Sequence, residues 1–291
     1  MKAAPFVYHR PDTLAEALAL LFEHGDDAKV LAGGQSLLPL MALRLGRPAH
    51  LVDISRVPGL DRLEVAGDGS VSIGAMVRHA VLERDARLAT SAPLLHETMP
   101  WIAHRAIRTR GTSVGSIAHG DPAAELPAVA LATAATMRLL STQGERTVAA
   151  ADFFEGYLQT ALRSDELLAE VTFPAWPADA ACSLTEITRR HGDYALVGLA
   201  AVLRVEHGTV VDAALAYFGA ASTPVRVPEA EQALIGRPPS EEAGAEAAGI
   251  AAGALNPTGD LHGSAAYRKH LVGVVTRRGL AAAGAKIGAS V

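Results

Sequence analysis

The first part of the chain alternates between helix-like and strand-like patterns of apolar side chains. Apolar residues recur three or four positions apart after Thr13, and Gly25 marks the expected end of this helix. Thr13 and Glu16 have the spacing of a capping box, in which each side chain accepts the other residue's backbone N–H. There follow an expected strand, helix and strand, at residues 29–32, 36–45 and 51–54. Residues 1–55 therefore predict a small β–α–β unit.

Beyond this unit the apolar pattern predicts short hairpins and Ala-rich helices. Glycines at a turn separate two alternating segments at 63–65 and 71–73, which is typical of a hairpin. Helical stretches are expected within 76–109. Paired strands are expected at 136–141 and 146–148, and another strand at 170–173.

A proline-containing segment at 174–179 predicts a domain boundary, with residues 1–176 on one side and 177–291 on the other. The second part predicts an antiparallel sheet followed by Ala-rich helices. Its expected strands are 184–188, 196–205 and 210–218, with a turn at His207 and the following glycine. This succession of strands and helices indicates an α+β protein built in layers.

Composition narrows the class of protein. The 291 residues carry a net charge of −5, which argues against nucleic acid as a partner because phosphate binding needs a basic surface. No apolar run reaches the roughly 20 residues that a membrane span requires, and the N-terminus does not resemble a signal peptide. Cys182 is the only cysteine, which is typical of a reducing cytoplasm. A single cysteine also excludes a cysteine-ligated iron–sulfur cluster held within this chain.

The most informative segment is a glycine turn between the strand at 29–32 and the helix that follows it. Its residues are Ala32, Gly33, Gly34, Gln35 and Ser36. Glycines leave no side chain between backbone and ligand, so successive N–H groups can surround a phosphate near a helix N-terminus. The segment matches neither G-x-G-x-x-G nor a P-loop. A plain strand–turn–helix, with Ser36 as the N-cap, explains the same residues equally well.

A second glycine-rich segment, residues 110–121, lies in a predicted loop with hydroxyl groups at Thr112 and Ser116. Asp121, followed by proline, predicts the N-cap of a helix, and Glu125 lies one turn into that helix. A carboxylate is stabilised at this positive end. Two glycine loops and a carboxylate suit an adenine dinucleotide, because the loops can bind its pyrophosphate and the carboxylate can accept hydrogen bonds from its ribose hydroxyls. The alternative is that Asp121 only caps the helix and Glu125 only complements its dipole.

These segments carry a resemblance to a known family. Ala-Gly-Gly-Gln-Ser-Leu-Leu-Pro from residue 32, and Arg-Gly-Thr-Ser-Val-Gly-Ser-Ile-Ala-His-Gly-Asp-Pro-Ala-Ala-Glu-Leu-Pro from residue 110, resemble the FAD-binding medium subunit of the molybdenum hydroxylases. This family includes carbon monoxide dehydrogenase and the quinoline, nicotine and xanthine dehydrogenases. The resemblance covers nearly the whole chain, including residues 189–195, which resemble the opening of the family's C-terminal domain.

The resemblance implies a specific fold. Residues 1–176 would form a PCMH-type FAD-binding domain of the vanillyl-alcohol-oxidase class, made of two α+β subdomains at 1–55 and 56–176. Residues 177–291 would form a domain like the C-terminal domain of the CO dehydrogenase flavoprotein. That domain combines a three-stranded antiparallel sheet with helices.

The resemblance also implies which residues bind non-covalent FAD. Ala32, Gly33, Gly34, Gln35 and Ser36 match the family's first pyrophosphate loop, and Thr112, Val114, Gly115 and Ser116 belong to its second. Asp121 and Glu125 occupy the acidic positions, with Glu125 favoured for the ribose, and Tyr194 and Ala195 lie where the family approaches the flavin ring. Family members usually have two adjacent glycines where this chain has Val114 and Gly115. Either Val114 never needed glycine's conformations, or this turn is rebuilt.

The implied function is electron transfer within a larger oxidoreductase. A large partner would carry the molybdenum–pterin centre that hydroxylates the substrate, and a small partner would carry two [2Fe–2S] clusters. FAD on this chain would pass their electrons to an external acceptor, and the assembly would be a cytoplasmic dimer of heterotrimers. No catalytic residue and no metal ligand is predicted on this chain, and His104 and His119 are interpreted as structural histidines. The alternatives are a self-contained flavin oxidase or dehydrogenase, and a cofactor-free assembly module motivated by Val114.

Overall fold

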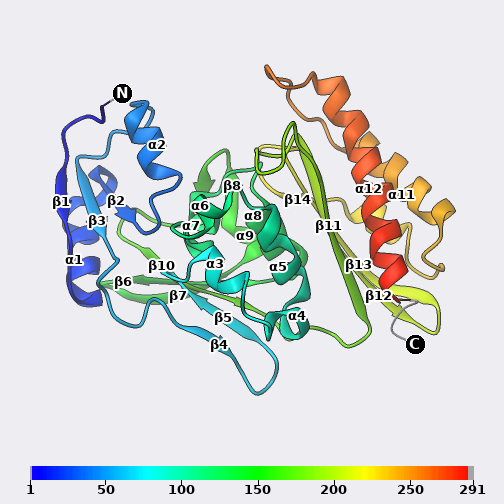
Figure 1. The fold of residues 1–291 in the computed structure, drawn as a ribbon, viewed down its shortest axis with the longest axis horizontal. Helices are drawn as coiled ribbons and strands as arrows, with labels where there is room; N and C mark the ends of the chain where they lie inside the picture. The colour runs from blue at the N-terminus through cyan, green and yellow to red at the C-terminus, as the bar shows by residue number, and fades with distance from the viewer. Residues whose placement is uncertain (1, 288–291) are drawn as a thin grey trace.

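Three larger sheets and one two-stranded ribbon follow one another in the computed structural model, which describes residues 2–287 (Figure 1). The first sheet has three parallel strands in the order β1-β3-β2. The predicted β–α–β unit is confirmed, and β1 adds a third strand that the sequence did not predict. The bounds are β1 Val7–His9, α1 Leu14–His24, the 3₁₀ turn η1 Gly25–Asp27, β2 Ala28–Leu31, α2 Leu37–Ala42 and β3 His50–Asp53.

Helix α1 confirms the capping box. The Thr13 hydroxyl accepts the Glu16 N–H at 3.2 Å, and the Glu16 carboxylate accepts the Thr13 N–H at 3.3 Å. Gly25 ends the helix with a φ of 48°. The buried face of α1, with Leu21 at its centre, packs against β2 and β3. Helical spacing of apolar residues therefore places α1 over this sheet.

The second sheet is antiparallel, with the strand order β4-β5-β10-β6-β7, and both predicted hairpins are present in it. Short helices connect its strands (Figure 1). Its strands are β4 Leu63–Val65, β5 Val71–Gly74, β6 Thr136–Ser141, β7 Gly144–Ala149 and β10 Leu167–Phe173, and β8 Phe154–Gly156 pairs with β9 Gln159–Thr160. The helices are α3 His79–Leu82, α4 Leu88–Ser91, α5 Pro93–Thr98, η2 Met99–Trp101, α6 Arg105–Arg108, α7 Ser113–His119, α8 Glu125–Ala132 and α9 Ala150–Phe153.

Two expectations about the segment 110–121 were wrong. The predicted loop is mostly the helix α7, which starts where the Thr112 hydroxyl accepts the Gly115 N–H. Asp121 does not cap the next helix. Its carboxylate accepts the Ala123 N–H at 2.9 Å in a turn, and α8 begins only at Glu125. The glycines hid the threonine cap, because glycine-rich sequence is more typical of a loop than of a helix.

The third sheet, at the C-terminal end, is antiparallel in the order β11-β12-β13-β14. Three long strands confirm the expectation, and the two-residue β14 adds a fourth at the edge. The helix α12 is the longest described helix, but no helix within residues 2–287 is long and apolar enough to cross a membrane. The bounds are β11 Ala180–Ile187, β12 Val197–Glu206, β13 Thr209–Phe218, β14 Val225–Arg226, α10 Pro228–Gln232, α11 Glu241–Ala254 and α12 Ala265–Ile287.

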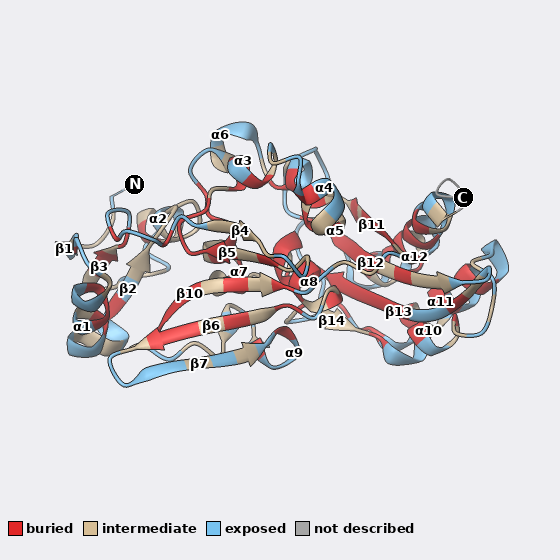
Figure 2. Ribbon diagram, turned by 90° about the horizontal axis from the view of Figure 1, so that it is seen from below, coloured by how far each residue is buried: buried red, intermediate tan, exposed pale blue. Residues whose placement is uncertain are grey.

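Both faces of this C-terminal sheet are covered, and Figure 2 shows most of β12 and β13 as buried. On β12, Leu199 and Leu203 pack with residues of α11 and α12 on one face. Ala200 packs on the opposite face with apolar residues of α8. A strand buried on both sides is apolar at nearly every position, which explains the continuous apolar run in β12. The sheet thus joins the two hydrophobic cores.

A buried hydroxyl pair ties β13 to α12. The Thr276 hydroxyl donates to the Val272 carbonyl at 2.7 Å, so the Tyr217 hydroxyl, at 2.8 Å, donates to Thr276. We expect Tyr217→Phe to lower the free energy of unfolding by about 1 kcal/mol, because one buried hydrogen bond is lost. Tyr267→Phe, at a tyrosine that is 46% exposed, is the matched control and should change it little. Urea unfolding would measure both, and equal midpoints would contradict the prediction.

Candidate functional site

The two glycine-rich segments touch through their backbones. A Cβ atom added to Gly33 would lie 2.6 Å from the Arg110 carbonyl oxygen and 2.8 Å from the Thr112 nitrogen. No side chain fits there, so residue 33 has to be glycine for the segments to meet. On the same side, the Ala32 methyl lies 3.8 Å from the position that a Cβ of Gly115 would take. The structure therefore brings the two predicted loops together.

The first segment forms a turn that its own side chains stabilise. Gly34 has a φ of 71°, a conformation that favours glycine. The Gln35 amide donates to the Gly33 carbonyl at 3.1 Å. Ser36 occupies the N-cap position of α2, but its hydroxyl makes no capping hydrogen bond. That hydroxyl instead lies near the Tyr194 side chain.

The second segment is the start of α7. Val114 is only 1% exposed, lies within the helix and packs into the core. This position therefore does not need glycine's conformations, which decides between the two alternatives left by the sequence. The next residues, Gly115 and Ser116, are half-buried. The cofactor-free interpretation loses its motivation, because it depended on Val114.

A pair of backbone hydrogen bonds anchors this segment to residues 77–79. The Ser113 N–H donates to the Val77 carbonyl, and the His79 N–H donates to the Gly111 carbonyl, both at 3.1 Å. The His79 ring is buried and lies 3.0 Å from the Ser113 hydroxyl. Burial, with the nearby Arg108 and Arg78 charges, lowers the pKa of His79 to about 4. No motif near His79 in the sequence predicts this neutral, supporting imidazole.

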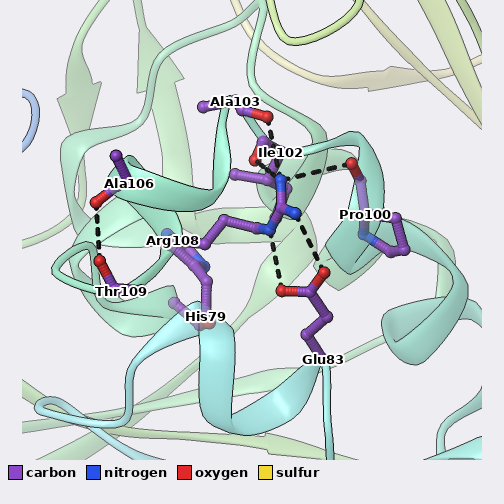
Figure 3. Close-up of polar contacts among 9 residues, drawn as sticks. His79, Glu83, Pro100, Ile102, Ala103, Ala106, Arg108 and Thr109 are labelled. Carbon is purple, nitrogen blue, oxygen red and sulfur yellow. Dashed lines mark hydrogen bonds and ion pairs between the residues drawn. The ribbon is translucent and has the colours of Figure 1, made fainter.

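Arg108 holds the chain in place just before the second segment (Figure 3). Its guanidinium donates two hydrogen bonds to the Glu83 carboxylate, at 2.9 and 3.0 Å. It also donates to the carbonyls of Ile102 and Ala103, both at 3.0 Å. The Arg108 side chain is only 11% exposed, so the planar fork satisfies several buried acceptors at once. Arg108 therefore has a structural role and is not part of a basic surface.

Buried acids gather at the start of α8. Glu125 is only 8% exposed, and burial raises its pKa to about 7. Glu186 of β11 lies nearby, and both of its carboxylate oxygens lack a hydrogen-bond partner among the described residues. Burial and the Glu125 charge raise the pKa of Glu186 to about 8. Buried polar groups normally have a hydrogen-bond partner. The unpaired Glu186 carboxylate therefore makes this region a candidate for ligand binding.

The segment 189–195 reaches the same place from the C-terminal part. Desolvation and the charges of Asp121 and Glu125 raise the pKa of Tyr194, although 63% of its surface is exposed. Ala195 is buried beside it. Tyr157, which the sequence analysis did not single out, is also among the neighbours of Tyr194.

The two histidines near the second segment have different surroundings. A Cβ atom at Gly192 would lie 2.6 Å from the His104 ring, so His104 packs directly against the segment 189–195. Next to it, the Trp101 and His191 rings lie 5.9 Å apart. His119 ends α7 and is half-buried, and desolvation lowers its pKa. His104 thus helps to join the C-terminal segment to the site.

The assembled site has the features that a dinucleotide requires. The two glycine-rich segments adjoin at Gly33, next to the N-terminus of α7, a position that favours a phosphate. Glu125, at the start of α8, lies near Glu186 of β11. Every residue that the sequence predicted for the site is in this region, although the Val114 side chain points into the core. Glu186 and His79 were missed because their neighbours are far away in the sequence.

The acid pair predicts an unusual pH dependence of stability. A carboxyl group whose pKa is higher in the folded state binds a proton more tightly there, so stability falls as the pH rises from about 4.5 towards 8. We expect Glu186→Gln in the flavin-free chain to be the more stable protein at pH 8.5, by more than about 1 kcal/mol, with little difference at pH 5. Thermal unfolding at both pH values would measure this. The exposed Glu155→Gln should show no such change, and parallel curves for Glu186→Gln and the unmodified chain would contradict the assignment.

Comparisons with known proteins match this geometry. The family model described as the FAD binding domain in molybdopterin dehydrogenase matches residues 4–176. The model of the CO dehydrogenase flavoprotein C-terminal domain matches residues 183–283. Together these models cover both glycine segments, the acid pair and the segment 189–195.

Relatives of this chain match it from end to end. It is 42% identical to the 6-hydroxypseudooxynicotine dehydrogenase complex subunit alpha of Paenarthrobacter nicotinovorans, over 97% of this chain and 96% of that protein. It is similar to a chain of carbon monoxide dehydrogenase from Hydrogenophaga pseudoflava, with a TM-score of 0.95, 40% identity and coverage of 98% and 99%. For quinoline 2-oxidoreductase from Pseudomonas putida 86 the TM-score is 0.93, the identity 38% and the coverage 99% of both chains. The chain therefore belongs to the family of FAD-binding medium subunits of the molybdenum hydroxylases.

Proposed function

We propose that this chain takes electrons from [2Fe–2S] clusters on a partner subunit and passes them, through its bound FAD, to an external acceptor. The contact between the Gly33 backbone and residues 110–112 carries this proposal, because it brings the two predicted phosphate-binding segments together. FAD supplies the redox chemistry, and the protein supplies its binding, orientation and electrostatic surroundings. No side chain of this chain is required as an acid or base.

The pyrophosphate of FAD would lie at the junction of the two glycine segments. Main-chain N–H groups of the glycine turn at residues 32–36 would bind one side of the pyrophosphate. The N-terminal turn of α7 would bind the other side. Because the Val114 side chain is buried, only its backbone can contribute. The proposed contacts are Ala32, Gly33, Gly34, Gln35, Ser36, Thr112, Val114, Gly115 and Ser116.

The remaining proposed contacts orient the rest of the cofactor. Glu125 would accept ribose hydroxyls, and Asp121 would support it from the turn before α8. Glu186 lies near Glu125, and desolvation together with the Glu125 charge raises the pKa of Glu186. Tyr194 and Ala195 would lie against the flavin ring. The tyrosine is the only one of these that is largely exposed, so it can cover the ring from solvent.

The proposal includes two partner subunits. The only cysteine, Cys182, is buried, so this chain cannot hold the clusters and a small iron–sulfur subunit must do so. A large molybdopterin subunit would hydroxylate the substrate, and we propose a cytoplasmic dimer of heterotrimers. Within this chain we propose a division at residue 176, with FAD-binding subdomains at 1–55 and 56–176 and a C-terminal domain at 177–291. The relatives named as subunits and medium chains support this organisation.

The proposed electron path is tested by comparing the isolated chain with the complex purified together with its partners. In the complex, the organic substrate that the large subunit oxidises should bleach the flavin absorbance anaerobically. The isolated chain, containing about one equivalent of FAD, should not react with that substrate. Turnover of the substrate by the isolated chain would overturn the proposal and favour a self-contained flavin enzyme.

Gly33→Val tests the proposed cradle. The added side chain would collide with backbone atoms of residues 110–112 and push the two segments apart. We expect the flavin content to fall at least about tenfold, because a misplaced backbone cannot be repaired by a side-chain rotation. The matched control is Gly67→Ala, in a hairpin turn where an added Cβ meets nothing within 4 Å. Flavin absorbance per chain and far-UV circular dichroism measure the outcome, and an unchanged flavin content would refute the contact.

A further inference from the structure

Three histidines from three different elements meet in the N-terminal subdomain, away from the glycine segments. His9 is the last residue of β1, His24 is the last residue of α1, and His50 is the first residue of β3. These three elements lie together in Figure 1. One ligand nitrogen of each ring lies within 4.8 Å of the others. The sequence analysis predicted no metal ligands because the recognised motifs are local, whereas these three residues are far apart along the chain.

The fold explains why the three rings converge. β1 pairs with β3 in parallel, and the register places the side chains of His9 and His50 on the same face of the sheet. On the other side of β3, Ala28 of β2 is opposite His50. Only the turn Gly25–Asp27 separates His24 from β2, so the end of α1 is held beside His50. Backbone pairing thus sets the positions of all three rings.

The rings contact one another directly. The His24 and His50 rings are stacked, with centroids 3.7 Å apart, and Nε2 of His9 lies 2.9 Å from Nδ1 of His50. In that hydrogen bond one nitrogen must accept, so at least one ring is neutral, which is the form that binds metal. Burial and the two neighbouring imidazoles lower the pKa of His9, while Glu23 opposes them.

We propose that His9, His24 and His50 form a site for a divalent transition metal of the zinc type. Imidazole nitrogen is a preferred ligand of Zn²⁺, Cu²⁺ and Ni²⁺, and three such ligands plus a water complete a tetrahedral zinc site. All three side chains are half-buried, so the ion can enter from solvent and keep a water as its fourth ligand.

Metal binding requires the rings to turn out of their stacked arrangement, because imidazole lone pairs lie in the ring plane and the His24 and His50 rings are nearly parallel. Nitrogens at 2.0–2.1 Å from a tetrahedral zinc lie about 3.3 Å from one another. The ligand nitrogens, already within 4.8 Å, can reach that spacing by rotation about χ2 of each histidine, a torsion with a broad energy minimum.

The proposed metal would act as a structural clip that is independent of flavin binding. Because β2 and β3 are parallel, His50 lies at their N-terminal end, while the glycine turn follows the other end of β2. The strand β1 has only three residues and lies at the edge of the sheet, so few hydrogen bonds hold it. A metal bound to His9, His24 and His50 would tie both β1 and α1 to the central strand.

Zinc titration of the untagged, full-length chain tests the proposal. After removal of metals with EDTA, calorimetric titration with ZnCl₂ should show about one equivalent bound per chain. At a hundredfold excess over the dissociation constant, Zn²⁺ should raise the melting temperature by about 5 °C. Replacement by Co²⁺ should give the intense visible bands of a four-coordinate site. Absence of saturable binding, or the weak spectrum of octahedral Co²⁺, would overturn the proposal.

Substitutions identify the ligands. His9→Ala, His24→Ala and His50→Ala should each weaken Zn²⁺ binding by at least about tenfold and abolish the zinc-dependent rise in melting temperature. His270→Ala, at an exposed position on α12, is the matched control and should bind Zn²⁺ like the unmodified chain. Flavin content and far-UV circular dichroism of each variant verify that it is folded. Unchanged affinity in all three cluster variants would show that zinc binds elsewhere and would refute the site.

Discussion

The whole site depends on one close approach between two stretches of main chain. Gly33 lies against residues 110–112 so tightly that not even a methyl group fits between them. The approach brings the turn at residues 32–36 next to the N-terminus of α7. The surrounding structure serves this contact, because β2 delivers one segment and the pairing with residues 77–79 fixes the other. Arg108 then fixes the chain that leads into it.

Much of the proposed site could be named from the sequence because it consists of consecutive residues. In the glycine turn at 32–36 and the segment from Thr112 to Glu125, the signals are local. They are glycines without side chains and an acid at the start of a helix. The parts that could not be predicted act across the fold. His79 supports Ser113, and Glu186 faces Glu125, only because separate elements meet. The spacing of residues along the chain does not predict such contacts between separate elements.

The fold was predictable wherever an element has a clear pattern of apolar residues. The capping box of α1, the hairpins and the long strands β12 and β13 all have strong local patterns. The expectation failed where local signals compete, as in α7, whose threonine cap is surrounded by glycines. It also failed for β1, whose three residues include two exposed apolar side chains and show no alternation. Tertiary pairing, and not intrinsic preference, makes that segment a strand.

The doubly covered C-terminal sheet limits how this family can be recombined. Alanines at 200, 214 and 216 belong to the same core as the apolar residues of α8, and that helix begins with the acid Glu125. A chimaera joining the amino-terminal half of one homologue to the carboxy-terminal half of another would have to match these small side chains to the new helix. A bulkier residue there would shift α8 along the sheet and carry its carboxylate away from the proposed nucleotide site. Compatibility of the two halves would therefore be visible first as altered cofactor retention.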